Sequence, residues 1–213
     1  MGLGGVILAA GASSRMGTDK ALLPWPPQST RMLPQAGLVT GGTLLSAAIE
    51  ALGHYCDMVI VVGGSNENVI RPVAYSCGAF FARNPDPDRG QFSSLQTGVH
   101  EVVNRGRDAA MITLVDRPPP KGATLAKLVD AFQRRDHSRW TVVPEFEGKH
   151  GHPILIGPEM IEIFITSPVT SNAREIEHAN QKRIVYVPVD DSRVTMNINT
   201  PEDYARLGSS FQI

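Results

Sequence analysis

Short apolar runs that favour β-strands recur along the chain, and segments with helical periodicity separate most of them. The seven strand candidates are residues 5–9, 57–62, 79–83, 109–115, 140–144, 153–156 and 184–189. Apolar side chains fall on one helical face in residues 45–52, 95–103 and 125–132. Because this alternation is typical of parallel strands joined by crossover helices, we expect an α/β fold, a Rossmann-like three-layer sandwich with a mostly parallel central sheet.

The run Ala110–Val115 is almost continuously apolar, as strands are when helices cover both sheet faces, so we expect it to be central. Two helical segments, Pro158–Thr166 and Ser171–Gln181, follow one another later in the chain. A chain of 213 residues is long enough for one sizeable core and short for two enzyme domains. We expect a single domain over residues 1–213, with a nucleotide-binding half to about residue 140 and an acceptor-binding half from about residue 141.

The composition argues against several classes of function. Twenty Lys and Arg against 21 Asp and Glu give a formal net charge of -1, which offers no basic surface for nucleic acid. No apolar run is long enough to span a bilayer and no signal-type segment is visible, so we expect a cytoplasmic protein without a membrane partner. Cys56 and Cys77 fit neither a disulfide framework nor a metal-ligand spacing, and we expect both to be buried and reduced.

The first strand candidate runs into a loop of small residues, which continues to Lys20 and which we call the glycine loop (residues 9–20). Gly11 and Gly17 can adopt positive φ and let a bulky anion approach, and Ser13 adds a hydroxyl donor. Arg15 and Lys20 supply positive charge for phosphate oxygens. The dinucleotide pattern G-x-G-x-x-G and the P-loop pattern are both absent. The loop therefore predicts a triphosphate site of another kind.

The segments Leu8-Ala9-Ala10-Gly11 and Arg15-Met16-Gly17, followed by Lys20, resemble the signature of the molybdenum-cofactor nucleotidylyltransferases, the molybdopterin cytidylyltransferase and guanylyltransferase family. The resemblance extends from Val6 to Tyr204. It implies a fold of the nucleotide-diphospho-sugar transferase type and an enzyme that transfers CMP or GMP to molybdopterin or its molybdenum-loaded form, with release of pyrophosphate. The nucleotide contacts that it implies in this segment are Leu8, Ala9, Ala10, Gly11, Ser13, Arg15, Met16, Gly17 and Lys20.

The turn-rich run from Asn84 to Leu95 enters a helix, and Ser93 or Ser94 is placed to cap it. The run resembles a family loop that approaches the nucleotide. Asn84, Gly90, Ser93 and Ser94 are therefore candidate nucleotide contacts. The alternative is that the serines form a helix cap and nothing more.

Asp116 directly follows the apolar strand candidate, at the carboxyl end where ligands of open α/β sheets bind. Its carboxylate is a hard oxygen donor that suits Mg²⁺, the expected cofactor. Family members usually have Gly before this Asp and Gln or Met after it, so Val115 and Arg117 depart from the pattern while the carboxylate remains. Arg15, Lys20 and Asp116 are the catalytic candidates, and the implied reaction is in-line attack by an acceptor phosphate oxygen on the α-phosphorus.

The segment Met196–Asp203 resembles the terminal motif of the family. Asn197 and Asn199 share one side of an extended segment, and Thr200 is placed to cap a helix whose first residue is Pro201. Asn199 is the candidate second metal ligand, through its carbonyl oxygen, and Asn197 a candidate acceptor contact. The alternative is that this motif only caps a helix.

The resemblance places His152, Pro153 and Arg174 in the acceptor site. His150 and His152, two positions apart, can alternatively share a zinc ion, although no third ligand is evident. Relatives pass from Pro24-Trp25 almost at once to the helix that begins here near Thr43, so residues 26–42 form an insertion of undetermined role.

The expected nucleotide is CTP rather than GTP, because guanylyl relatives usually have a second glycine where this chain has Ala10, and a methyl group there disfavours a purine. Guanylyl relatives, and therefore GTP, are instead resembled at Asn197, Asn199 and the pair Asp19-Lys20. The expected partners are the triphosphate, a molybdopterin-type acceptor and a molybdoenzyme or cofactor chaperone. Two alternatives remain: another phosphorylated acceptor, such as a sugar phosphate or an alcohol phosphate, or a nucleotide-binding regulatory protein without turnover.

Overall fold

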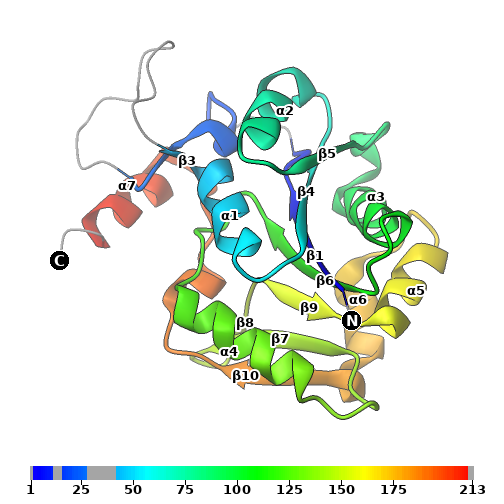
Figure 1. The fold of residues 1–213 in the computed structure, drawn as a ribbon. Coiled ribbons are helices and arrows are strands. Elements are labelled where there is room, and N and C mark those ends of the chain that lie inside the picture. Colours follow the sequence, from blue (N-terminus) through cyan, green and yellow to red (C-terminus); the bar gives the residue numbers. More distant parts are fainter. Residues whose placement is uncertain (1, 12–15, 28–41, 211–213) are drawn as a thin grey trace.

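The computed structural model describes residues 2–11, 16–27 and 42–210 (Figure 1). One eight-stranded sheet forms its centre, with the order β10-β7-β9-β6-β1-β4-β5 and with β8 paired to β7 outside this path. The strands are β1 Leu3–Leu8, β4 Met58–Gly63, β5 Phe80–Arg83, β6 Ala109–Leu114, β7 Thr141–Phe146, β8 Lys149–His150, β9 Ile154–Ile156 and β10 Ile184–Pro188. β9 is antiparallel to β6 and β7, and β8 is antiparallel to β7, whereas the other neighbours are parallel. The expected mostly parallel sheet is confirmed.

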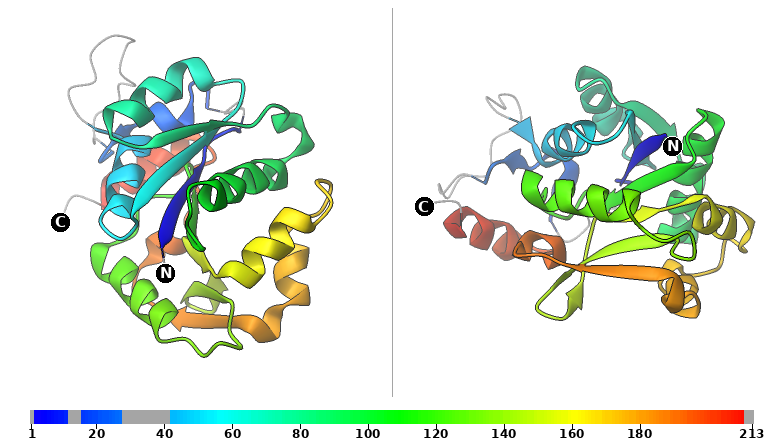
Figure 2. Two further views of the ribbon diagram at one scale, coloured as in Figure 1. Left: turned by 45° about the vertical axis from the view of Figure 1, so that its right-hand side comes forward. Right: turned by 60° about the horizontal axis from the view of Figure 1, so that its bottom comes forward.

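Helices cover both faces of this sheet (Figure 2). The described helices are α1 Leu44–Gly53, α2 Glu67–Ser76, α3 Gln91–Asn104, α4 Gly122–Gln133, α5 Pro158–Thr166, α6 Ala173–Ala179 and α7 Pro201–Ser210. Apolar side chains of α1, α2 and α4 form one core layer with the sheet, and those of α3, α5 and α6 form the other. The three-layer sandwich that the sequence predicts is therefore present.

The strand β1 shows why the apolar runs are continuous. Ile7 packs into the core under α1, whereas Val6 and Leu8 pack on the opposite face under α3. Successive side chains of a strand point to opposite faces, so a strand with two covered faces needs apolar residues at every position. β6 lies between β1 and β9 and is central, as predicted.

Two short strands lie outside the main sheet. β2 (Pro24–Trp25) pairs antiparallel with β3 (Gly42–Thr43), which leads directly into α1. The sequence predicted a loop from Pro24 to Gly42, so the structure corrects its two ends, while residues 28–41 lie outside the described residues. Pairing became possible because the two ends of the segment meet beside α1.

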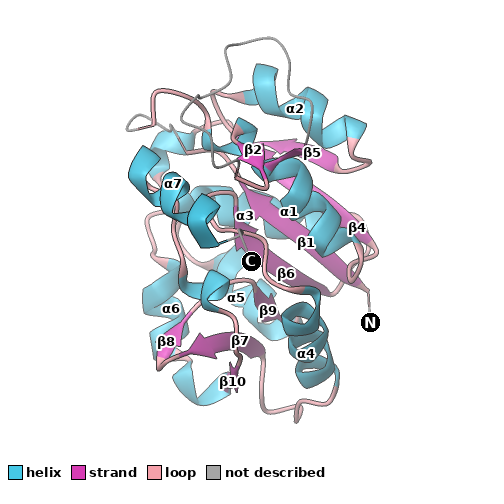
Figure 3. Ribbon diagram, turned by 90° about the vertical axis from the view of Figure 1, so that its left-hand side faces the viewer, coloured by secondary structure: helices cyan, strands magenta, loops and turns pink. Residues whose placement is uncertain are grey.

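The helix α7 lies beside this region (Figure 3), and a third, smaller core joins the two. It consists of Met16, Leu23, Leu44, Ile198 and Leu207, with Trp25, Met196 and Tyr204 packed against it. The Tyr204 hydroxyl donates a hydrogen bond to the Pro24 carbonyl. This packing holds the terminal motif over the carboxyl edge of the parallel strands, where β1, β4 and β6 end.

The expectation that both cysteines are buried needs correction. Cys56 is buried and Cys77 is exposed, although both are free thiols. Burial raises the pKa of Cys56 to about 12, with a further contribution from the negative charge of Asp57. Among the helices in the described part of the chain, none has the length and apolar character needed to cross a membrane.

Candidate functional site

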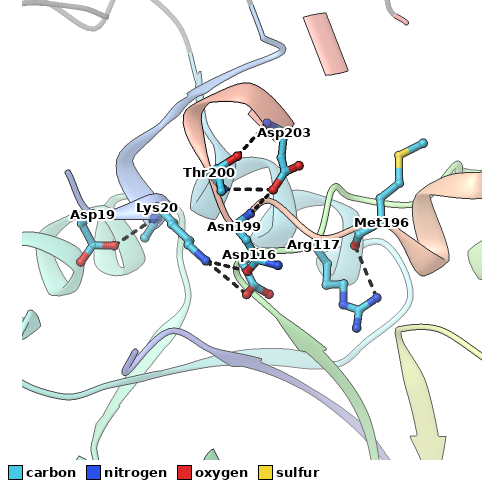
Figure 4. Close-up of polar contacts among 9 residues, drawn as sticks. Asp19, Lys20, Asp116, Arg117, Met196, Asn199, Thr200 and Asp203 are labelled. Carbon is cyan, nitrogen blue, oxygen red and sulfur yellow. Dashed lines mark hydrogen bonds and ion pairs between the residues drawn. The ribbon is translucent and has the colours of Figure 1, made fainter. Parts of the chain in front are cut away.

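Three side chains from distant parts of the chain meet at the carboxyl edge of the sheet (Figure 4). Lys20 begins the 3₁₀ helix η1 (Lys20–Leu22), Asp116 follows β6, and Asn199 precedes α7. Lys20 Nζ lies 3.5 Å from Asp116 Oδ2 and donates a hydrogen bond of 3.2 Å to Asn199 Oδ1. The side chains of Lys20 and Asp116 are 15% and 27% exposed, so the pair is sheltered but reachable. We call these three residues the charged cluster.

Local hydrogen bonds fix Asn199 within this cluster. Ile198 is fully buried, and its N–H donates to the Asp116 carbonyl at 2.8 Å. Thr200 Oγ1 accepts from the Asp203 N–H at 3.2 Å, which confirms the predicted helix cap. Asp203 Oδ2 in turn accepts from the N–H groups of Asn199 and Thr200, each at 3.0 Å. The bond from Asn199 is the main reason why the pKa of Asp203 lies below its ordinary value.

Asp116 has one oxygen that makes no hydrogen bond to any of the residues that the structure describes. Its Oδ1 is buried and makes no hydrogen bond, whereas Oδ2 faces Lys20. A buried polar oxygen without a partner is costly, which is a reason to look for a ligand there. The carboxylate of Asp116 and the carbonyl oxygen of Asn199 are hard donors of the kind that Mg²⁺ takes.

The number of protein ligands also limits the kind of metal. Within the described residues, no group of three or more His, Cys, Asp and Glu is placed to hold an ion. Mg²⁺ commonly uses one or two carboxylates and completes its shell with water and substrate phosphates. The charged cluster therefore fits a hard cation that arrives with a phosphorylated substrate, and it does not fit a structural zinc site.

The glycine loop begins where β1 ends. Ala9 is buried, and its N–H donates to the Val62 carbonyl at 2.8 Å. Gly17 adopts the predicted positive φ, at 67°, whereas Gly11 does not. A Cβ added at Gly11 would meet nothing within 4 Å, so this position faces open space. Met16 is buried in the small core beneath α7. The predicted contacts Ser13 and Arg15 lie outside the described residues.

Asn84, Ser93 and Ser94 are brought together, but they face one another, and we call them the buried cluster. Their side chains are buried, with exposed fractions of 3%, 6% and 4%. Asn84 Nδ2 donates to Ser93 Oγ at 2.8 Å and to Ser94 Oγ at 2.9 Å, while Asn84 Oδ1 accepts from the Asp86 N–H at 3.0 Å. These bonds fix the loop between β5 and α3 from within.

The predicted serine cap of α3 is wrong. The helix begins at Gln91, directly after Gly90, whose φ is 96°. Ser93 therefore lies inside the first turn, where its hydroxyl donates to the Gly90 carbonyl at 2.8 Å. Glycine reaches this φ without strain, so the backbone at Gly90 starts the helix in place of a side-chain cap. The N-terminus of α3, which favours anions, lies at the carboxyl end of β5.

His152 turns towards the core. Its backbone N–H donates to the Val194 carbonyl at 2.9 Å, and its ring Nδ1 lies 3.4 Å from the Ile112 carbonyl. Burial lowers the pKa of His152 to about 4, and the charge of Arg117 contributes, so the imidazole is neutral near pH 7. A Cβ at Gly151 would overlap the Val194 carbonyl, so only glycine allows this close approach.

The other acceptor candidates are less closely placed. Pro153 follows His152 in the interior, Asn197 is exposed beside the charged cluster, and Arg174 is exposed on α6. His150 stacks on Tyr186, with ring centroids 4.0 Å apart, and its Nε2 lies 3.4 Å from Glu145 Oε2. His150 and His152 thus have separate partners, which gives no support to a shared zinc ion.

Arg117 has a structural position that the sequence did not reveal. Its Nη1 lies 3.4 Å from the carbonyl oxygens of Val194 and Met196, and its side chain points away from Lys20 (Figure 4). Burial lowers the pKa of Arg117, and the charge of Asp116 opposes this shift. Arg117 therefore fastens the segment before Asn199. Its departure from the family pattern was the only signal in the sequence.

Residues 5–184 match a family described as the MobA-like NTP transferase domain. The chain belongs to this family. It is 27% identical over 206 residues to the molybdenum cofactor cytidylyltransferase of Escherichia coli K12, covering 93% of this chain and 92% of that protein. It is also 28% identical over 211 residues to a probable molybdenum cofactor guanylyltransferase of Rhodopirellula baltica, covering 97% and 90%.

Solved structures share the fold. Rv0371c from Mycobacterium tuberculosis H37Rv superposes with a TM-score of 0.77 at 23% identity, covering 98% of this chain and 97% of that chain. Another structure of Rv0371c is a complex with manganese, with a TM-score of 0.71 at 19% identity and coverage of 99% and 100%. Family membership and the site geometry together identify the chain as a nucleotidyltransferase.

Proposed function

We propose that the protein transfers CMP from CTP to molybdopterin or its molybdenum-loaded form, with Mg²⁺ as the metal and release of pyrophosphate. The observation that carries this proposal is the charged cluster beside the glycine loop, in which one buried Asp116 oxygen lacks a partner. The names of both relatives assign them to synthesis of the molybdenum cofactor, which supports the acceptor class. The manganese complex of Rv0371c supports the use of a divalent metal.

In the proposed reaction, a phosphate oxygen of the acceptor attacks the α-phosphorus in line with the leaving pyrophosphate. One P–O bond forms to the acceptor, and the bond between the α-phosphorus and the bridging oxygen breaks. The ammonium group of Lys20 lies beside Asp116, at 3.5 Å. Its role in the proposal is to stabilise the negative charge that grows on the phosphate oxygens during transfer. Asp116 and Asn199 would hold Mg²⁺, which supplies charge neutralisation at the phosphates when bound.

The proposed nucleotide site consists of the glycine loop and the N-terminus of α3. The glycine loop offers its backbone and open space at Gly11, and it includes the predicted contacts Arg15 and Ser13. Asn84, Ser93 and Ser94 act in this proposal by shaping the start of α3, because their own side chains are buried. Gly90 provides the backbone turn that directs the helix N-terminus to the site.

The choice of CTP rests on Ala10. Identity to a cytidylyltransferase and to a guanylyltransferase is nearly equal, so the relatives alone do not separate the bases. The Ala10 methyl group occupies space beside the base that a glycine would leave open, which disfavours the larger purine. Asn197 and Asn199 favour GTP by resemblance and are the reason to test both nucleotides.

The acceptor is proposed to bind in the half of the domain that begins near residue 141, at His152, Pro153, Asn197 and Arg174. A neutral His152 can form hydrogen bonds with the acceptor but adds no charge, so Arg174 is the proposed phosphate contact. The expected molybdoenzyme or chaperone partner has no support in the fold or the relatives, and it is not part of this proposal.

The test is a transfer assay with purified protein, Mg²⁺ and either CTP or GTP. Molybdopterin is compared with sugar phosphates as acceptor, and pyrophosphate release is measured together with the mass of the product. We expect CTP and molybdopterin to give the cytidylylated product, and Ala10→Gly to raise turnover of GTP. Preference for GTP would overturn the base, turnover of a sugar phosphate would overturn the acceptor, and binding without turnover would favour a regulatory protein.

A further inference from the structure

Asn66, in the turn between β4 and α2, connects three separate segments. Its Nδ2 donates to the Ala9 carbonyl at 2.8 Å and to Asp19 Oδ2 at 2.6 Å. Its Oδ1 accepts from the Gly64 N–H at 3.1 Å. Although Asn66 precedes the first residue of α2, its side chain makes no cap bond to that helix. The carboxamide is therefore directed at the glycine loop and not at its own helix.

The two donor contacts of Asn66 lie at opposite ends of the glycine loop. Ala9 follows β1, and Asp19 is the last residue before η1, with nine residues between them. The loop therefore starts and ends on one carboxamide. The turn that carries Asn66 also touches the loop, since a Cβ added at Gly64 would lie 3.2 Å from the Ala10 carbonyl.

Asp19 connects Asn66 to the backbone of η1, which carries Lys20. Asp19 Oδ1 accepts from the Ala21 N–H at 2.9 Å and caps η1, while Oδ2 receives the Asn66 amide. The side chains of Asp19 and Lys20 point to opposite sides of the chain, so that Lys20 reaches the charged cluster (Figure 4). An error of about 1 Å in the placement of a reacting group can lower a rate by about 10²-fold.

We propose that Asn66 is a positioning residue for nucleotidyl transfer: it closes the glycine loop and sets the place from which Lys20 reaches the α-phosphate. The chemistry of the side chain suits this role, because only a carboxamide of this length has two N–H donors and an acceptor oxygen. Asp has no donor at this position and would place a second carboxylate beside Asp19. Alanine would leave the loop without its common anchor.

The experiment compares kinetics and stability of Asn66→Ala with those of Asn180→Ala. Asn180 is a matched control because its Nδ2 also donates to a backbone carbonyl, that of Ile176, but at the C-terminal end of α6. We expect Asn66→Ala to lower kcat by roughly tenfold to 100-fold with a smaller change in KM for the nucleotide. Its thermal unfolding midpoint should fall no more than that of Asn180→Ala. Unchanged kcat in Asn66→Ala would overturn the proposal.

A reciprocal exchange separates positioning from a general loss of structure. Asn66→Asp should be slower than Asn66→Ala, because the new carboxylate faces Asp19. Combining Asn66→Asp with Asp19→Asn exchanges amide and carboxylate and should recover part of the rate. A double variant no faster than Asn66→Asp would contradict the proposal. If Asn66→Asp does not fold, the cycle of Asn66→Ala and Asp19→Asn decides, and independent multiplicative losses would overturn the coupling.

This inference rests on the proposed transfer but not on the identity of the base or acceptor. Equilibrium binding of CTP and GTP to the same variants needs no acceptor, so it remains measurable if the proposed acceptor is wrong. We expect Asn66→Ala to weaken binding of the nucleotide that the wild-type protein prefers, while Asn180→Ala leaves it unchanged. If Asn66→Ala and the wild-type protein have equal nucleotide binding and equal kcat, the positioning role of Asn66 is contradicted, and the proposed transfer reaction is not.

Discussion

The charged cluster and the buried cluster lie at the same edge of the sheet but differ in how far the protein satisfies their polar groups. In the buried cluster, the Asn84 carboxamide uses both donors and its acceptor within the protein. In the charged cluster, Asp116 keeps a buried oxygen that has no partner in the described part of the chain. A satisfied buried network specifies a conformation, whereas an unsatisfied group marks a place where a ligand completes the structure. The contrast predicts that substitutions in the two clusters will have different consequences.

The largest effect is expected for Asp116→Asn. The substitution keeps the shape of the side chain but removes the charge that faces Lys20 and the proposed metal, so kcat/KM should fall by roughly 10³-fold. The unfolding midpoint should change little. Asp130→Asn is the control, since Asp130 forms an exposed ion pair with Arg134 at the C-terminal end of α4. Full activity of Asp116→Asn, or activity that persists in excess chelator, would show that the unpaired oxygen has no catalytic meaning.

Lys20→Met should lower kcat by roughly 10²-fold, because its charge acts most strongly on the charge that develops during transfer. KM for the nucleotide should rise less than kcat falls. Steady-state kinetics with varied nucleotide measure both quantities. Lys127→Met serves as the control, since that ammonium group donates to the Pro188 carbonyl on the exposed surface. A Lys20→Met variant with wild-type kinetics would remove the charged cluster from the mechanism.

Asn84→Ala should affect stability more than turnover. Removing the carboxamide leaves the hydroxyl groups of Ser93 and Ser94 without a shared partner, and the free energy of unfolding should fall by about 1–3 kcal/mol. Chemical denaturation measures this loss, with the exposed Asn104→Ala as control. Kinetics well below the unfolding midpoint should stay close to those of the wild type. A rise in nucleotide KM without loss of stability would instead make Asn84 a direct nucleotide contact.

The smallest effect concerns His152. It tests whether the protein encloses this side chain, as it encloses the side chains of the buried cluster. Its folded pKa of about 4 lies below the ordinary 6.5, so the folded state binds fewer protons than the unfolded state between these values. The free energy of unfolding should therefore fall as pH drops from 6.5 to 4, by at most about 1.4 kcal/mol per pH unit, and this contribution should be constant above and below that window.

The measurement is chemical denaturation at several pH values for the wild type, His152→Asn and the exposed His137→Asn. His152→Asn should have a shallower slope than the wild type, and His137→Asn should not. Equal slopes in all three proteins would mean that His152 is not desolvated in the folded protein, and would contradict its assignment as a neutral contact.

Patterns that depend on local periodicity were predictable from the sequence. The run Ala110–Val115 is central because both of its faces are buried, and Thr200 caps α7 because its hydroxyl reaches a neighbour three residues away. The helix α2 was not predicted, since it contains Pro72 and buries only Ile70 and Ala74. Sequence patterns give little support to such a helix, and its position is set by packing against α1 and β4.

The relations among side chains distant in sequence were harder to predict. Asp116 was placed correctly at the end of β6, but its distance from Asn199 depends on how α7 packs against the small core. The turn at Gly63–Asn66 looks ordinary in the sequence, and nothing local indicates that its amide reaches Asp19. Such contacts arise from tertiary packing between segments distant in the chain, which the local pattern of a single sequence does not reveal.

The pairing of β2 with β3 brings the chain before and after residues 26–41 together at one point, because Trp25 lies opposite Gly42 and Pro24 opposite Thr43. The entropy of closing a loop grows only with the logarithm of its length, by about 0.6 kcal/mol for each doubling. A connection of another length between these paired ends would therefore change the entropy of loop closure only slightly. The paired ends of β2 and β3 are therefore a suitable point for changing the length of the chain by protein engineering.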